Sequence, residues 1–300
     1  MPDKSLRRHT YGEYAERTRR LAAALLKLGL QRGDRVATLS WNHHAHLSAT
    51  RHSGCGRRDA HAEPAGCRPT RLGWIAADAQ DRFLIVDDIL LPLYRQFAPL
   101  HRFEKVIVFP FSGAKVDAEF IDYEALLGDS RRVGIRLRRS RRERPGGDVL
   151  HLGHHRATEG RGLFAPLDDA AHAGGQRSAT TGALRNTDVV MPATPMFHAN
   201  CWGIPYGVVM HGAKLVFPGP HLHPDDLLDL MTLEPPTMSL GVPTIWLSLI
   251  QTYERALAEG STRLEAAHRH ALAGRRRCGA RVADPRLRAP GASRSSKAGA

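Results

Sequence analysis

The sequence lacks both a long hydrophobic run and a cysteine framework. No apolar stretch reaches the roughly 20 residues that a membrane-spanning helix needs, and residues 1–8 are short and charged, unlike a secretion signal. The four cysteines stand far apart, without the paired spacing of a disulfide scaffold or a zinc knuckle. These absences argue against secretion and membrane insertion, so we expect a protein of the reducing cytoplasm.

Acidic residues are scarce relative to basic ones. The 300 residues include 43 lysines and arginines against 30 aspartates and glutamates, which gives a net charge of +13. Such an excess raises the hypothesis of a nucleic-acid or anionic-membrane partner. The arginines, however, gather in residues 131–144 and 275–288, which show no period that would place them on a folded surface. A basic nucleic-acid-binding protein therefore stays the alternative, and we expect no nucleic-acid partner.

The sequence does contain an alternation of helix and strand patterns. Thr10 and Glu13 have the spacing of a capping box and precede leucines that share one helical face. The later elements are a short buried strand over 36–39, a helix over 73–78, buried strands over 83–87 and 105–109, and a helix over 90–100. This alternation is typical of α/β folds.

Three stretches interrupt the alternation. Residues 50–71, 130–181 and 263–300 have no hydrophobic period and are rich in arginine, alanine, glycine and proline. Disorder is the ordinary interpretation of such composition.

Residues 184–250 hold the best candidate for a functional side chain. An apolar run leads into a polar turn with one histidine, His198, followed by a small-residue helix start and a second apolar run. This order is typical of a strand followed by a loop that carries functional residues. A histidine after an aromatic residue is more often packed or solvated than catalytic, so the pattern alone leaves its role open.

Two segments of this region carry a family resemblance. The segments Met196–Gly203 (MFHANCWG) and Gly241–Thr244 (GVPT) closely resemble the AMP-forming acyl-CoA synthetases, in particular bacterial medium- and long-chain fatty-acid–CoA ligases. The Thr-Tyr helix start, the Gly-Asp turn and the Trp-Asn pair before residue 50 occur in the same order in that family. The resemblance implies an α/β fold in which residues 1–262 form part of the large N-terminal domain. It also implies that residues 263–300 are a basic tail and that the family's C-terminal domain is absent.

The resemblance further implies an activity in two half-reactions. A fatty acid attacks the α-phosphate of ATP and releases pyrophosphate, and the thiol of coenzyme A then displaces AMP, with Mg²⁺ neutralising the phosphates. It places the histidine matching His198 beside the reacting carboxylate as the catalytic candidate. The implied substrate-binding positions, which shape the acyl and nucleotide pocket, are Gly203, Gly241, Val242, Pro243 and Thr244. Trp202 is a further substrate-binding candidate that could line an acyl tunnel, although an aromatic residue in apolar surroundings is more often simple core. Among the residues as translated, the resemblance assigns no nucleotide-binding residue and no metal ligand.

The aperiodic stretches have a sharper explanation in the genetic code. GC-rich coding DNA read out of frame yields mainly arginine, alanine, glycine and proline. Codons permitted for residues 149–161, read one base later, encode CYTSGTTGRPKG, which matches the family's glycine-rich phosphate-binding loop. Shifted readings of residues 51–65, 131–148 and 269–288 are family-like as well. We infer that the chain is a frame-damaged and truncated ligase, inactive as translated because it lacks that loop.

Besides the damaged ligase and the nucleic-acid-binding protein, a third hypothesis for the function of this chain remains, namely an α/β fragment without activity. The histidines at positions 43, 44 and 46 have no carboxylate or cysteine at useful spacing, so we expect a solvated loop rather than a metal site. The histidines at 151, 154 and 155 correspond to shifted threonine codons, which makes metal binding there improbable.

Overall fold

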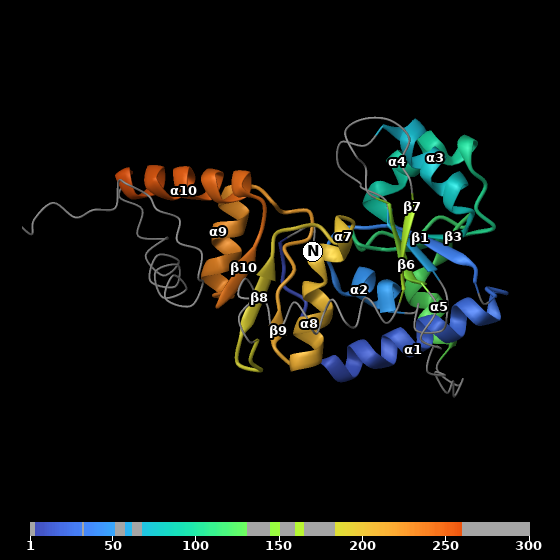
Figure 1. The fold of residues 1–300 in the computed structure, drawn as a ribbon, viewed down its shortest axis with the longest axis horizontal. Helices are drawn as coiled ribbons and strands as arrows, with labels where there is room; N and C mark the ends of the chain where they lie inside the picture. The colour runs from blue at the N-terminus through green and yellow to red at the C-terminus, as the bar shows by residue number, and fades with distance from the viewer. Residues whose placement is uncertain are drawn as a thin grey trace, which may run out of the picture.

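A computed structural model of the protein describes residues 4–31, 33–51, 58–61, 68–130, 145–150, 160–164 and 184–259. These residues form two lobes, each built on a sheet (Figure 1). The first lobe contains a seven-stranded sheet in the order β5-β4-β3-β1-β2-β6-β7, and the second a three-stranded sheet in the order β10-β8-β9. All described strand pairs are parallel except β6 with β7.

The first lobe alternates helices and strands, as the sequence predicts. Its elements are α1 (Tyr11–Lys27), β1 (Arg35–Leu39), α2 (His44–Arg51), β2 (Arg58–His61), α3 (Pro69–Ala79), β3 (Asp81–Asp87), α4 (Leu91–Phe97), β4 (Lys105–Phe109), β5 (Ile121–Asp122), α5 (Tyr123–Asp129), β6 (Pro145–Leu150) and β7 (Gly160–Phe164). Short 3₁₀ turns, Asp88–Leu90 and Ala98–Leu100, flank α4 and replace the ends of the predicted helix over 90–100.

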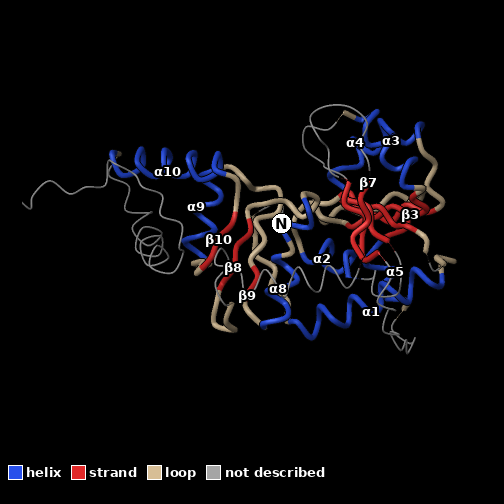
Figure 2. The backbone as a smooth tube through the Cα atoms, viewed as in Figure 1, coloured by secondary structure: helices blue, strands red, loops and turns tan. Residues whose placement is uncertain are grey.

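Side chains of β3, an interior strand of the larger sheet, alternate between two cores. Phe83 and Ile85 pack with α1, α2 and α5 on one face of the sheet, whereas Leu84 and Val86 pack with α3 and α4 on the other. Figure 2 shows helices on both sides of the larger sheet. A parallel sheet that is covered on both faces explains why the predicted strands are continuous apolar runs.

Local signals set the start of the first helix. The Thr10 side chain accepts a hydrogen bond from the backbone of Glu13, and the Glu13 carboxylate accepts from the backbone of Thr10, which confirms the predicted capping box. The hydrogen bonds from Thr10 also hold the pKa of Glu13 below its usual range.

The structure differs from the sequence prediction in the aperiodic stretches. Strands β2, β6 and β7 and the first turn of α3 lie where no regular element was expected. A parallel strand edge such as that of β1 pairs through backbone groups, which requires no hydrophobic period in its partner. The remainder of these stretches lies outside the described residues, namely 52–57, 62–67, 131–144, 151–159, 165–183 and 260–300.

The second lobe comprises β8 (Val189–Pro192), α7 (Ala199–Trp202), α8 (Ile204–His211), β9 (Lys214–Leu215), α9 (Pro224–Leu233), β10 (Met238–Leu240) and α10 (Pro243–Ala258). Its sheet packs Val190 against α8 on one face and Met191 against α9 and α10 on the other. None of the helices in the described ranges is long and apolar enough to cross a membrane.

The lobes meet at a small apolar cluster and along the N-terminal segment. Leu47 of α2 packs with Met196 and Cys201 of the second lobe. Residues 4–11 run along the second lobe before α1 begins: Lys4 pairs with Asp226 at 2.5 Å, and the Tyr11 hydroxyl donates to the carbonyl of Ala213. The first residues of the described chain therefore hold the two lobes together.

Candidate functional site

The loops that carry the sequence-predicted site residues leave one edge of the smaller sheet together. Strands β8 and β10 are parallel neighbours, with Pro192 opposite Leu240. Immediately beyond them, the backbone N–H groups of Ala193 and Thr194 donate to the carbonyl of Leu240 at 2.7 and 3.3 Å. The structure thus brings the loop of residues 193–203, here the His198 loop, beside Gly241–Thr244. Open α/β sheets bind ligands at this carboxyl edge.

His198 lies at an exposed turn of its loop. Its backbone N–H donates to the carbonyl of Pro195 at 3.1 Å, and its own carbonyl accepts from the N–H of Cys201 at 2.9 Å. The histidine is therefore fixed through its backbone while its side chain stays accessible. An accessible imidazole is a requirement for general acid or base chemistry on a bound substrate.

The residues that follow His198 adopt a left-handed turn. Asn200, Cys201 and Trp202 have φ angles of 52°, 52° and 54°, and Gly203 continues the turn at 72°. Each non-glycine residue in this conformation costs about 1–2 kcal/mol, and such strain clusters at functional sites. The sequence predicts a small-residue helix start here; α8 does begin at Ile204, but the residues just before it form a left-handed turn.

Contacts around Cys201 hold the strained turn in place. The Cys201 thiol is buried and donates to the carbonyl of Thr194 at 3.1 Å. Burial raises the pKa of this thiol to about 12, so it remains protonated and available as the donor. The neighbouring Trp202 side chain is 46% exposed, and the turn therefore presents Trp202 and His198 at the surface.

Gly241 allows the second loop to lie close to the first. A Cβ atom added at this position would lie 3.2 Å from the ring of Trp246 and 3.3 Å from the Cβ of Ala193. The Trp246 indole N–H donates to the carbonyl of Gly241 at 3.0 Å and fixes the loop against α10. Val242, Pro243 and Thr244, at the start of α10, are exposed.

Asn42 joins the His198 loop to the larger sheet. The side chain of this residue, which follows β1 and is 4% exposed, donates to the carbonyl of Thr194 at 2.9 Å and accepts from the N–H of Met196 at 2.7 Å. One amide thereby fixes two points of the loop just before His198. Sequence reasoning noticed the Trp-Asn pair only as part of a resemblance and gave Asn42 no role.

Of the histidines after β1, His43 and His46 are buried and His44 is partly buried, which contradicts the predicted solvated loop. His43 contacts Asp87 through Nε2 and Oδ1 at 2.9 Å, and the other Asp87 oxygen accepts from the N–H of Trp41 at 2.8 Å. Asp87 ends β3, so this carboxylate is distant in sequence and adjacent in space. Desolvation lowers the pKa of His44 to about 2 and that of His46 to about 4, with the charge of His43 the next cause. No metal-binding group of three such side chains occurs among the described residues.

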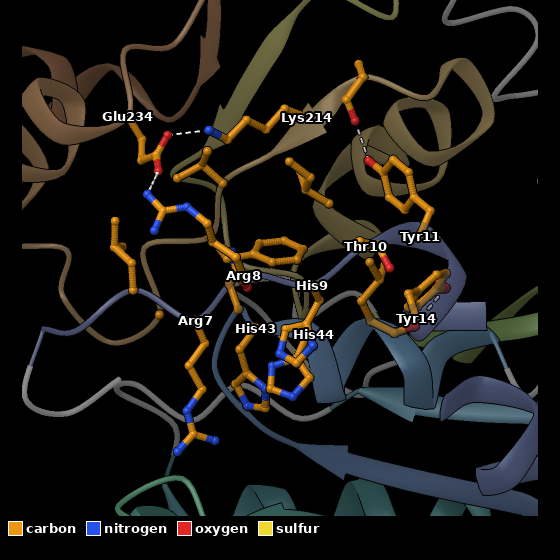
Figure 3. Close-up of a pocket in the computed structure, with 18 of the residues that line it drawn as sticks. Arg7, Arg8, His9, Thr10, Tyr11, Tyr14, His43, His44, Lys214 and Glu234 are labelled. Atoms are coloured by element: carbon orange, nitrogen blue, oxygen red, sulfur yellow. Dashed lines mark hydrogen bonds and ion pairs between the residues drawn. The ribbon is translucent and has the colours of Figure 1, made fainter. Parts of the chain in front are cut away.

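A cavity of about 460 Å³ lies beside these histidines. Figure 3 shows it between the N-terminal segment, the start of α2 and the region around β9. Its walls include Arg7, Arg8, His44 and Lys214. Asn42 also lines it, whereas His198 and the other sequence-predicted site residues do not. The predicted site and the cavity are therefore separate places, joined where Asn42 and Leu47 of the cavity wall contact the His198 loop. The basic runs at 131–144 and 275–288 lie outside the described residues.

Comparison with known sequences gives consistent matches. The sequence model of the AMP-binding enzyme family matches residues 3–124 and 169–290. A long-chain-fatty-acid–CoA ligase of Thermus thermophilus is 37% identical over 254 residues, covering 82% of this chain and 44% of the relative. A 3-methylmercaptopropionyl-CoA ligase of Ruegeria lacuscaerulensis is 31% identical over 287 residues, covering 91% of this chain and 50% of the relative. The chain spans about half the length of these curated relatives.

Comparison with solved structures supports the fold. An anthranilate–CoA ligase in complex with anthranoyl-AMP superposes with a TM-score of 0.72 at 18% identity, covering 81% of this chain and 46% of the ligase. A long-chain-fatty-acid–CoA ligase of Archaeoglobus fulgidus superposes with a TM-score of 0.70 at 20% identity, covering 82% and 47%. The α/β fold is thus that of about half of an adenylate-forming enzyme.

Proposed function

We propose that this chain, which belongs to the AMP-binding enzyme family, carries part of the N-terminal domain of a fatty-acid–CoA ligase. The complete enzyme would form an acyl-adenylate from ATP and a medium- or long-chain fatty acid and pass the acyl group to coenzyme A. The observation that carries this proposal is the His198 loop, which leaves the carboxyl edge of the smaller sheet beside Gly241–Thr244.

The roles proposed for the loop residues follow from their accessibility. The exposed His198 would lie beside the fatty-acid carboxylate and orient it for attack. Trp202, Gly203 and residues 241–244 would form the wall along the acyl chain and the nucleotide. The hydrogen bonds from Asn42 to Thr194 and Met196 would keep the imidazole at a fixed distance from that wall.

The described residues do not supply the whole of such a site. The stretch whose shifted reading gives the glycine-rich loop covers residues 149–161, of which 151–159 lie outside the described residues. The described chain also offers no three-ligand cluster for Mg²⁺. We propose that the chain as written forms no acyl-adenylate because it lacks the loop that positions the triphosphate.

The experiment compares three proteins in an assay of pyrophosphate release with ATP, Mg²⁺ and a fatty acid. The chain as written should be inactive. A version rebuilt in frame and extended through a C-terminal domain should release pyrophosphate, and His198→Ala in that version should slow release by about 10²-fold. His223→Ala, at another exposed histidine beside α9, is the matched control and should leave the rate unchanged.

Each arm of this experiment has a contrary outcome. Equal rates for the written and rebuilt chains would refute the proposed inactivity and its frame-damage explanation. An unchanged rate for His198→Ala would remove the catalytic role of His198. A rebuilt enzyme that accepts short or aromatic acids and no fatty acid would refute the substrate assignment.

A further inference from the structure

The cavity lies where the larger sheet reverses its direction of winding. From β1 the chain continues through α2, on one face of the sheet, to β2 on one side. From the neighbouring β3 it continues through α4, on the opposite face, to β4 on the other side. The connections after β1 and β3 therefore diverge, and a crevice opens beyond their carboxyl ends. Such switch points are the usual ligand sites of open parallel sheets.

The walls of the cavity come from the ends of these strands. Asn42, His43 and His44 follow β1, Phe109 ends β4, and Asp87, which holds His43, ends β3. The opposite wall is the second lobe around β9, with the N-terminal segment crossing above. The cavity is thus built from both lobes, and its wall residues Asn42 and Leu47 contact the His198 loop from the other side.

Flat rings form part of these walls. The rings of His43 and Phe109 are stacked with centroids 4.8 Å apart, and those of His9 and His44 with centroids 4.1 Å apart. Burial lowers the pKa of both His9 and His44, so both imidazoles are neutral near pH 7. Within each pair the two rings already contact each other, so the faces that line the cavity favour a flat, uncharged body packed against a pair rather than between its members.

The polar wall is positively charged. The cavity lining includes three cations, Arg7, Arg8 and Lys214, and one carboxylate, Glu234. Arg8 contacts one oxygen of Glu234 at 2.6 Å and Lys214 contacts the other, so that this carboxylate is fully engaged. Arg7 makes no ion pair within the part of the chain that the structure describes, and Figure 3 shows it extending away from Glu234. The surplus charge favours an anion.

We propose that this cavity binds a small organic anion whose body is an aromatic ring, such as an aryl carboxylate or an aryl phosphate. The anionic group pairs with Arg7, and the ring lies against the imidazole and phenyl faces. A volume of about 460 Å³ is within the range of small-molecule sites. The site is distinct from the one proposed for fatty-acid activation and does not depend on that activity.

The test is a titration of the full chain, labelled at histidine, followed by nuclear magnetic resonance. Benzoate and phenyl phosphate are the probes, with benzyl alcohol lacking the charge and inorganic phosphate lacking the ring. Benzoate or phenyl phosphate should shift the imidazole signals of His9, His43 and His44 and leave that of His198 in place. The stronger of the two probes identifies the anionic group.

Two exposed positions provide the variants. Arg7→Gln should weaken binding roughly tenfold or more, because it removes a charge-assisted contact, and Leu6→Trp should block the cavity with a larger side chain. Arg19→Gln, which removes an exposed arginine of α1 outside the cavity, should bind like the parent chain.

Three results would overturn the proposal. The first is that neither probe binds, or that a probe shifts His198 and not the three cavity histidines. The second is that both Arg7→Gln and Leu6→Trp bind as the parent does. The third is that benzyl alcohol or inorganic phosphate binds as tightly as the probes, which would refute the ligand class. A melting curve for each variant establishes that it is folded.

Discussion

Replacing Asn42 by alanine should destabilise the chain by about 2–4 kcal/mol. The substitution removes the buried hydrogen bond to the carbonyl of Thr194, which contributes about 1 kcal/mol. It also leaves the N–H of Met196 without a partner in a buried position, which costs about 1–3 kcal/mol. The carbonyl of Thr194 still accepts a hydrogen bond from the Cys201 thiol, so the free-energy cost at this carbonyl is smaller than that at the Met196 N–H.

Urea unfolding, followed by tryptophan fluorescence, measures this change. Asn186→Ala is the matched control, because Asn186 is exposed in a turn of the second lobe and its loss should change the free energy of unfolding by less than about 0.5 kcal/mol. Amide hydrogen exchange adds a local measurement: the Met196 amide should exchange faster in Asn42→Ala, beyond any change at Ile107 in β4. A stability like that of Asn186→Ala, with unchanged exchange at Met196, would refute the anchoring role.

Two further predictions concern groups near the same loops. The folded-state pKa values of His44 and His46 lie below the unfolded value of about 6.5, so the unfolded chain binds protons first as the pH falls. Each histidine should therefore lower the free energy of unfolding by about 1.4 kcal/mol per pH unit below 6.5. For His46 this loss should end at about pH 4, where the folded-state imidazole is protonated as well. Urea midpoints between pH 7.5 and 4.5 check this, and a His46→Gln variant as acid-sensitive as the parent would contradict the assignment for His46. Asn200→Gly should raise stability by about 1 kcal/mol, because it relieves a φ of 52° and removes a buried Oδ1 that has no hydrogen-bond partner among the described residues. Ser248→Gly, at an exposed helical position, should instead lower stability by about 1 kcal/mol, and equal effects of the two changes would show that the turn is unstrained.

The fold could be predicted where local patterns determine it. The capping box at Thr10 fixes the start of α1, and the apolar run of residues 83–87 identifies a strand that is covered on both faces. The position of His198 after a strand could also be predicted, because the apolar run and the turn are adjacent in sequence. These signals act within a few residues, so one sequence contains them in full.

The rest depends on contacts between distant residues. Asn42 and Thr194 are 152 positions apart, and His43 and Asp87 are 44 apart, so no periodicity connects them. The left-handed turn gives a weak signal at Asn200, a residue type that tolerates positive φ, and none at Cys201 or Trp202. Strand β2 pairs through its backbone, which its side-chain pattern does not reveal. Anchoring, burial and strain therefore required the structure.

The N-terminal segment also constrains the order of events during synthesis. Its partners are Asp226, reached from Lys4, and Glu234, reached from Arg8, which are 222 and 226 positions later in the chain. A ribosome adds about 5–20 residues per second, so this segment waits for more than about ten seconds before either partner exists. The core around α1 and β1 can form meanwhile from residues already made. Residues 4–8 are consequently synthesised long before the residues that pair with them, and they reach these native contacts late.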